Sequence, residues 1–161
     1  MVVVQTSLVL DPGDFRPAWL MVDVFKTAPL QLTPSEYRHL YAMVGTPYGW
    51  FDRTPWTDQQ LGGYLARPGL YLWGSYWTDV LCGYVELKAE AGASGQIIYL
   101  GLFPGYEGRG MGKHLLSLAI QSAWDLGCLQ VRVSTLSTDG LYALSNYLRR
   151  GFRVERQVHK H

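Results

Sequence analysis

A glycine-rich turn, Gly108-Arg109-Gly110-Met111-Gly112, is the stretch whose composition points most directly to chemistry. Glycine allows a tight turn and lets a ligand approach the backbone closely, because it has no Cβ. The turn follows an apolar run and precedes a segment of helical periodicity. Free N–H groups in the first turn of a helix, aided by the helix dipole, bind phosphate. These residues predict a pyrophosphate held by main-chain donors, and a glycine-rich helix start without a ligand is the alternative.

Two common nucleotide-binding motifs do not fit this turn. A Walker-type loop needs Gly, four residues and then Gly-Lys-Ser/Thr, but Lys113 is followed by His114, and Glu107 stands where the first glycine belongs. A dinucleotide motif needs Gly-x-Gly-x-x-Gly and an acidic residue about 20 residues further on. Here the spacing is Gly-x-Gly-x-Gly, and residues 129–133 contain no acidic side chain. A nucleoside triphosphate and a dinucleotide are therefore poor candidates for the ligand.

The composition predicts a single folded domain over residues 1–161. Hydrophobic residues make up 48% and charged residues 17%, which suits a globular protein with a sizeable core. The net charge of +1 gives no reason to expect a nucleic acid or a membrane as partner. Cys82 and Cys128 lack metal-like spacing, so we expect reduced thiols and no metal site. Without a signal peptide or an apolar run of spanning length, we expect a soluble, cytoplasmic protein.

Hydrophobic patterning predicts an α/β (α+β) fold, with strands and helices mixed around one sheet. The expected strands are residues 2–10, 18–25, 70–77, 80–88, 96–103, 129–135 and 152–158, and the expected helices are residues 33–44, 57–66, 110–126 and 139–150. A helix between the apolar runs 96–103 and 129–135 implies a parallel step in a mixed sheet. Helical spacing places Lys113, His114, Ser117, Gln121 and Asp125 on the exposed face of the third helix.

Two ordered motifs resemble those of the GNAT superfamily of acetyl-CoA-dependent N-acetyltransferases. Residues 102–112 are similar to its signature, in which Gln/Arg-x-x-Gly-x-Gly/Ala follows a central strand and opens a long helix. Ala143, Tyr147 and Gly151-Phe152 match its Ala-x-x-x-Tyr-x-x-x-Gly-Phe near the C-terminus. The resemblance covers residues 70–158. Glu107 departs from the usual Gln or Arg, and we expect Arg109 and Lys113 to compensate near the phosphates.

The resemblance implies a mostly antiparallel central sheet flanked by helices, acetyl-CoA as co-substrate, and direct attack of an amine on the thioester. The backbone N–H of Leu102 or a neighbour would donate to the thioester oxygen. Tyr147 would point its hydroxyl at the cofactor sulfur, although a core tyrosine beside Phe152 is the alternative. The residues expected to bind the cofactor are Leu102, Phe103, Gly108, Arg109, Gly110, Met111, Gly112 and Lys113.

Glu86 is the main candidate for the base that deprotonates the amine. It alternates with Val85 and Leu87 along a strand, so its side chain points to the opposite face of the sheet. A carboxylate in an aromatic cleft would have a raised pKa and could accept a proton directly or through water. An exposed strand glutamate, or a water chain acting as the base, is the alternative. His39 and His114 are lesser candidates.

Trp50, Phe51 and Trp56 lie in the region that forms the acceptor pocket in the resembling family, although ordinary packing under a loop would also explain them. The expected acceptor is a small-molecule amine. A protein N-terminus or lysine ranks lower, because the sequence has no acidic run to meet a basic peptide. A non-catalytic acetyl-CoA-binding module is the third possibility. A homodimer is possible by analogy with similar folds.

Overall fold

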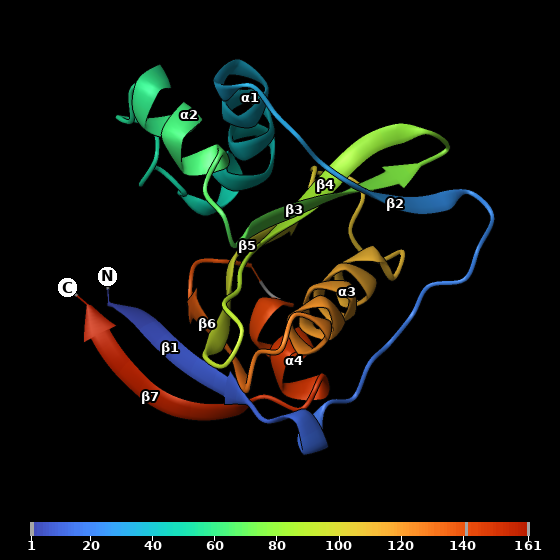
Figure 1. Cartoon of the computed structure of the whole chain (residues 1–161), viewed down its shortest axis with the longest axis vertical. Helices are drawn as coiled ribbons and strands as arrows, with labels where there is room; N and C mark the ends of the chain where they lie inside the picture. Colours follow the sequence, from blue (N-terminus) through green and yellow to red (C-terminus); the bar gives the residue numbers. More distant parts are fainter. Residues whose placement is uncertain (1, 141, 161) are drawn as a thin grey trace.

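A computed structural model describes residues 2–140 and 142–160 of the chain. Strands in this part form one sheet in the order β2-β3-β4-β5-β6-β1-β7 (Figure 1). Their bounds are β1 Val3–Leu10, β2 Phe25–Pro29, β3 Leu70–Trp77, β4 Val80–Lys88, β5 Ser94–Leu102, β6 Gln130–Leu136 and β7 Arg153–Lys160. The neighbours pair antiparallel, except for the parallel pair β5 and β6. The predicted mixed sheet with one parallel step is confirmed.

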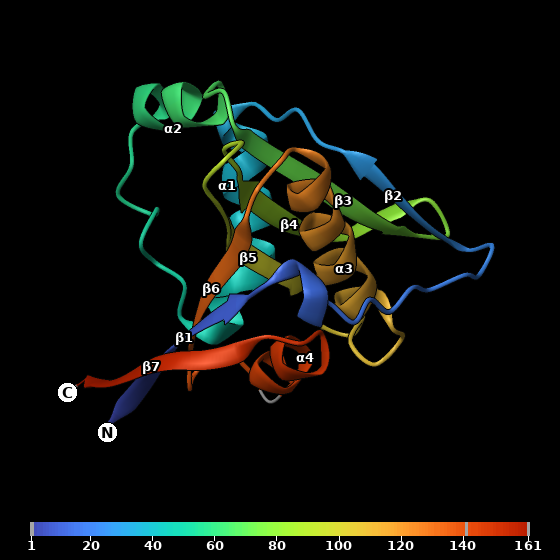
Figure 2. The same cartoon turned by 60° about the horizontal axis from the view of Figure 1, so that its bottom comes forward.

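Helices cover both faces of the sheet (Figure 2). Their bounds are α1 Pro34–Gly45, α2 Asp58–Leu65, α3 Met111–Asp125 and α4 Ala143–Arg149. The alternation of β4 separates two cores, because successive side chains of a strand point to opposite faces. Val85 and Leu87 join the core around α3, whereas Tyr84 joins the core around α1 and α2. Glu86 shares the face of Tyr84, as its alternation predicted.

Capping chemistry sets the starts of the first two helices. The Thr33 hydroxyl accepts from the backbone N–H of Glu36, and the backbone N–H of Thr33 donates to the Glu36 carboxylate in return, which completes a capping box before α1. Thr57 and Gln60 form the same arrangement before α2. The last turn of α3 is followed by Gly127 at φ 89°, the left-handed conformation that ends helices. The predictions for these helix ends are confirmed.

The strand predicted over residues 18–25 is wrong. Residues 15–24, here called the strap, cross α3 without regular structure, and β2 begins only at Phe25. The N–H of Ala18 donates to Ser117 Oγ at 2.9 Å, and the N–H of Leu20 donates to His114 Nδ1 at 2.9 Å. These backbone donors therefore bond to side chains of a helix rather than to a neighbouring strand. The alternating hydrophobicity of residues 18–25 indicated that one side of the segment is buried, but it did not indicate that the segment packs on a helix.

The same contacts correct the predicted exposed face of α3. Ser117 is fully buried, and His114 packs edge-on against Trp19 and Phe25 with ring centroids 5.2 and 4.7 Å away. Burial lowers the pKa of His114, which keeps Nδ1 free to accept the bond from Leu20. Both residues are polar because they receive backbone donors of the strap. Sequence periodicity could not reveal this cover.

The last helix is shorter than predicted, since α4 starts at Ala143 and not near Asp139. The side chain of Asp139 makes hydrogen bonds to the preceding residues instead. Its Oδ2 accepts from the backbone N–H of Leu136 at 2.7 Å and from Thr135 Oγ1 at 3.0 Å. Its side chain thus closes a turn directly after β6. Gly140 follows at φ 111°, a conformation that no helix contains.

Within the described residues, no helix is long and apolar enough to cross a membrane. The same part of the chain contains no group of three or more His, Cys, Asp or Glu side chains arranged to hold a metal ion. Cys82 and Cys128 are buried and free. The two ends of the described chain lie side by side, since Val3 pairs with Lys160 at the open end of β1 and β7 (Figure 1).

Candidate active site

The glycine-rich turn leads from β5 into α3 through left-handed backbone. Gly105, Gly108 and Gly110 have φ values of 90°, 82° and 87°, which side-chain-bearing residues rarely adopt. Gly110 is the N-cap of α3, and no side chain caps this helix start. The first N–H groups of α3 have no intrahelical acceptor by the geometry of the helix. An uncapped helix start of this kind is an anion-binding arrangement.

Space above the turn is open where a phosphate would approach. A Cβ added at Gly108 would meet nothing within 4 Å, and one at Gly112 would meet only Asn146 Nδ2 at 3.9 Å. At Gly110 the nearest atoms are Lys113 Cε at 3.3 Å and Leu20 Cδ1 at 3.4 Å. The strap therefore touches the turn at Gly110, while Gly108 and Gly112 leave the backbone accessible. These residues fit a pyrophosphate group.

Charged side chains flank the turn. The guanidinium of Arg109 lies over the rings of Trp77 and Tyr106, at 5.1 and 5.0 Å from their centroids, and Lys113 is exposed. Glu107 folds back so that its carboxylate accepts from the N–H of Gly105 at 3.1 Å. The departure from the resembling motif at Glu107 thus serves the turn itself. Two cations remain beside the glycines.

A cavity of about 320 Å³ opens where β5 and β6 separate. Their parallel pairing ends at Ile97 and Val133, although β5 continues to Leu102 and β6 to Leu136. The cavity is lined by Gln5, Trp50, Asp52, Ile98, Tyr99, Leu100, Val133, Ser134, Thr135, Leu136, Asp139, Ala143, Tyr147 and Lys160. Leu102 and Phe103, predicted to bind the cofactor, lie between this cavity and the glycine turn along the chain.

Tyr147 reaches the cavity from α4. Its ring packs edge-on against Phe152 with centroids 5.8 Å apart, and it also lines the cavity. This placement agrees with a core tyrosine as well as with a tyrosine of the active site. Burial, followed by the negative charge of Asp139, raises the pKa of Tyr147. The phenol is therefore protonated across the physiological range and can donate its proton or a hydrogen bond.

Glu86 lies in a closed cluster of side chains, and it is paired with Tyr99 in the register of β4 and β5. It is fully buried, and its Oε1 accepts from the Tyr37 hydroxyl at 2.8 Å. Its Oε2 accepts from Arg53 Nη1 at 2.7 Å and from the Tyr64 hydroxyl. We call Tyr37, Arg53, Tyr64 and Glu86 the clamp. Burial and then the charge of Glu86 raise the pKa values of Tyr37 and Tyr64, so both hydroxyls stay donors.

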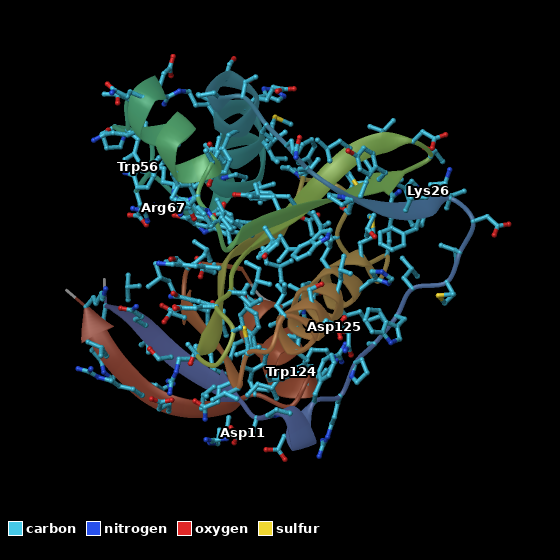
Figure 3. The ribbon with its side chains drawn as sticks, viewed as in Figure 1. Asp11, Lys26, Trp56, Arg67, Trp124 and Asp125 are labelled. Atoms are coloured by element: carbon cyan, nitrogen blue, oxygen red, sulfur yellow. The ribbon has the colours of Figure 1, made fainter. Side chains whose placement is uncertain are left out.

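The three predicted substrate residues are not brought together. Trp50 lines the cavity, and its Nε1 donates to Asp139 Oδ1 at 3.1 Å. Phe51 is largely exposed. Trp56 packs against the Arg53 guanidinium at 5.0 Å and against the Tyr64 ring at 5.4 Å. Figure 3 shows Trp56 beside α2, well away from Trp124 and Asp125 on α3.

Sequence reasoning missed the partners of Glu86 and the role of Asp139. Tyr37 recurs with Leu40, Tyr41 and Val44 at helical spacing, which signals a buried face but not what its hydroxyl meets. Tyr64 is 22 residues from Glu86, and Asp139 is 89 residues from Trp50. Contacts at such separations leave no periodic trace in a single sequence. Aromatic density around Trp50 was the one available signal.

Comparison with known proteins shows which family has this fold. The model of the acetyltransferase (GNAT) family matches residues 35–152. No curated protein matches the chain by sequence. A GCN5-related N-acetyltransferase from Sphaerobacter thermophilus superposes with a TM-score of 0.74 at 17% identity, over 97% of this chain and 50% of that one. A GCN5-related N-acetyltransferase from Kribbella flavida gives 0.69 at 18%, over 97% and 56%.

PaiA N-acetyltransferase of Thermoplasma acidophilum, solved in complex with coenzyme A, gives a TM-score of 0.65 at 21% identity, over 81% of this chain and 91% of that one. At these identities the similarity concerns the fold. The chain spans 56% and 60% of the lengths of the first two similar structures. The glycine turn and the opening between β5 and β6 therefore belong to a fold shared with N-acetyltransferases.

Proposed function

Since the chain belongs to the acetyltransferase (GNAT) family, we propose that it transfers the acetyl group of acetyl-CoA to the amine of a small molecule. The family uses acetyl-CoA. The observation that carries the proposal is the uncapped, glycine-lined start of α3, joined through the end of β5 to a cavity that contains Tyr147. An anion site and a reaction cavity on one strand suit a long cofactor with phosphates at one end and a thioester at the other.

In the proposed complex, Gly108, Gly110 and Gly112 bring backbone donors to the pyrophosphate, with Met111 opening α3. Arg109 and Lys113 supply positive charge. The chain from Phe103 back to Leu102 leads into the opening between β5 and β6, where the thioester would lie. Beyond Ile97 the edge of β5 that faces β6 has no strand partner in the described part of the chain. A backbone N–H there can donate to the thioester oxygen.

The reaction follows from these positions. The neutral amine attacks the carbonyl carbon, and a main-chain donor stabilises the oxygen as it becomes negative, worth about 2.7–4 kcal/mol. The C–S bond breaks, and the thiolate takes a proton or a hydrogen bond from the Tyr147 hydroxyl. The nitrogen, positively charged after the attack, gives one proton to a base, and a Tyr147 hydroxyl that has donated its proton regains one from water. Acetylated amine and the free thiol of coenzyme A leave.

Glu86 stays a prediction as that base. Its carboxylate already accepts from Tyr37, Arg53 and Tyr64. Because the carboxylate is fully buried, an amine or a water molecule can reach it only if the surrounding side chains move. These contacts favour a second role, in which Glu86 holds Arg53 and the loop that carries Trp50.

A small-molecule acceptor is favoured by the cavity's modest volume of about 320 Å³ and its aromatic wall. We further propose that residues 1–161 act as one acetyltransferase unit. Cytoplasmic location and a homodimer stay predictions. Two free, buried cysteines agree with a reducing compartment.

The proposal is tested by following the release of free thiol from acetyl-CoA with and without a panel of amines and short peptides. Release that depends on small amines, with acetylated amine found by mass spectrometry, supports it. Preference for peptides would indicate a protein acetyltransferase. Cofactor binding without any release would leave a non-catalytic acetyl-CoA-binding module.

A further inference from the structure

Two neighbouring charged residues in the loop between α1 and α2 have opposite surroundings. Arg53 points into the protein, where its side chain is 9% exposed and pairs with Glu86. Asp52 is exposed and lines the cavity that contains Tyr147. The clamp cancels the charge of Arg53 internally. The charge that this loop presents to the cavity is therefore the carboxylate of Asp52.

The other charged side chains among the described residues of the cavity wall are Asp139 and Lys160. Asp139 accepts only from neutral donors, namely Trp50 Nε1, Thr135 Oγ1 and the N–H of Leu136. Ion pairs formed by the described residues include neither Asp52 nor Asp139. Among the described lining residues, Lys160 at the end of β7 is the single cationic side chain. Two carboxylates thus face one ammonium group.

Two aromatic rings share the cavity wall with Asp52. Trp50 and Tyr99 line the same cavity, with ring centroids 4.8 Å apart. The pKa of Tyr99 is raised by burial and the Tyr41 hydrogen bond and, to a smaller extent, by the charge of Asp52. Aromatic faces beside a carboxylate attract organic cations. Arg53 approaches Tyr99 at 4.9 Å, but its charge is matched by Glu86.

We infer that the acceptor amine arrives as a cation and that Asp52 is the residue that binds its ammonium group, with Trp50 and Tyr99 as the aromatic wall. The inference rests on the proposed acetyl transfer and names the charge class of its substrate. Aliphatic amines have a pKa near that of lysine, about 10.4, so they are almost wholly protonated at neutral pH. A binding site for them must accept the ammonium form first.

Proton balance follows from the exposure of Asp52. The bound ammonium releases one proton to water at the open side of the cavity, the neutral nitrogen attacks the thioester, and its second proton leaves by the base described above. Asp52 is neither oxidised nor bonded covalently. Its contribution is affinity and orientation, so its removal should act mainly on KM.

The test compares an amine that is charged at neutral pH, benzylamine, with one that is uncharged, aniline, in steady-state acetylation. Asp52→Asn should raise KM for benzylamine about 10- to 100-fold, as expected for loss of a charge-assisted hydrogen bond. Its effect on kcat should be smaller, and KM for aniline should change less than threefold. Asp52→Glu keeps the charge and should recover most of the benzylamine affinity.

The matched control is Asp125→Asn, because Asp125 is an exposed carboxylate on α3 that does not line this cavity and lies far from α2 (Figure 3). This variant should leave both KM values unchanged. Equal losses for benzylamine and aniline in Asp52→Asn, or no loss for either, would overturn the inference while acetyl transfer itself stands. If the parent protein acetylates neither amine nor any other member of the panel, the proposed function fails and the inference with it.

Discussion

At the scale of single residues, the site depends on hydrogen-bond donors that remain available to a ligand. Glycines leave backbone donors uncovered at the start of α3, and burial leaves the Tyr147 hydroxyl protonated. The glycine turn was predictable because the motif is local and each glycine meets a local need. The neighbours of Glu86 were not predictable, because the sequence around a strand glutamate does not show whether its carboxylate contacts water or a buried arginine. Burial of the partner Arg53 depends on the whole fold.

Gly112 offers the sharpest test of the phosphate site. It has helical geometry and no positive φ, and a Cβ there meets no atom closer than 3.9 Å, so Gly112→Val should fold. Side chains in the first helical turn lean toward its N-terminus, where the phosphates are placed. We expect coenzyme A affinity to fall at least tenfold by isothermal titration. Gly63→Val on α2, where a Cβ is equally unhindered, is the control and should bind normally.

Gly110→Val is a weaker experiment, because φ at Gly110 is 87° and a β-branched residue would strain the turn by itself. Lost binding in that variant would not distinguish a blocked phosphate from a distorted helix start. Unchanged coenzyme A affinity in folded Gly112→Val, by contrast, means that the phosphates lie elsewhere.

Tyr147→Phe tests the leaving-group role. The ring and its contact with Phe152 remain, and one hydroxyl is lost. Turnover should fall about tenfold to a thousandfold, which corresponds to roughly 1.4–4 kcal/mol, while coenzyme A affinity changes little. Steady-state rates on the best amine, measured together with the unfolding midpoint, distinguish a leaving-group role of Tyr147 from a role in the core alone. Full turnover in a stable variant makes Tyr147 a core residue only.

At the scale of elements, the clamp fastens the helical layer to the sheet. Tyr37 comes from α1, Arg53 from the following loop, Tyr64 from α2 and Glu86 from β4, so one buried ion pair ties four segments together. Arg53 also packs over the rings of Tyr64 and Tyr99 at 4.1 and 4.9 Å. This arrangement fixes the loop that carries Trp50 and Asp52 over the cavity.

Breaking the clamp from one side should therefore cost stability. Glu86→Gln or Arg53→Met leaves an uncompensated buried group, and each should lower the free energy of unfolding by about 3–5 kcal/mol. The double variant should be less destabilised than the sum of the two. Urea unfolding of the four proteins closes the cycle. Additive losses would show that the pair is not coupled.

The same Glu86→Gln protein addresses the base through its pH–rate profile. A base would give lost turnover near neutral pH and partial recovery at high pH, where the acceptor deprotonates unaided. A profile superimposable on that of the parent, after correction for folded fraction, removes Glu86 from proton transfer.

Elements with local signals were predicted well, and the strap was not. Capping boxes, turn glycines and period-2 runs lie within a few residues of what they determine. The strap has the hydrophobicity of a strand, but its amides bond to Ser117 and His114, which lie 99 and 94 residues away. The start of α4 was misplaced for a local reason, because Asp139 bonds backward to Leu136 and Thr135 and does not begin the helix.

At the scale of the whole molecule, buried tyrosines make the stability of the fold depend on pH in the alkaline range. Burial is the largest cause of raised pKa values for Tyr37, Tyr64, Tyr84, Tyr99 and Tyr147. The unfolded chain releases these protons first as the pH rises past about 10. The stability that the neutral tyrosines contribute is thus present below that pH and is lost as the pH rises toward the folded values.

Denaturant midpoints measured from pH 7 to 11.5 should be flat at first and then fall above pH 10. Each buried tyrosine contributes a slope of about 1.4 kcal/mol per pH unit. Tyr147→Phe should reduce the slope by one such step. A midpoint that rises or stays level above pH 10 contradicts this burial of phenols.

The whole account depends on an anion site at the start of α3 that belongs to coenzyme A. Isothermal titration of the purified chain with coenzyme A, and with ATP and NAD as controls, tests this most directly. We expect one molecule of coenzyme A bound per site, with no comparable heat from ATP or NAD, because their motifs do not fit the turn. Absence of binding to coenzyme A and acetyl-CoA would contradict the assigned site and the acetyl transfer built on it.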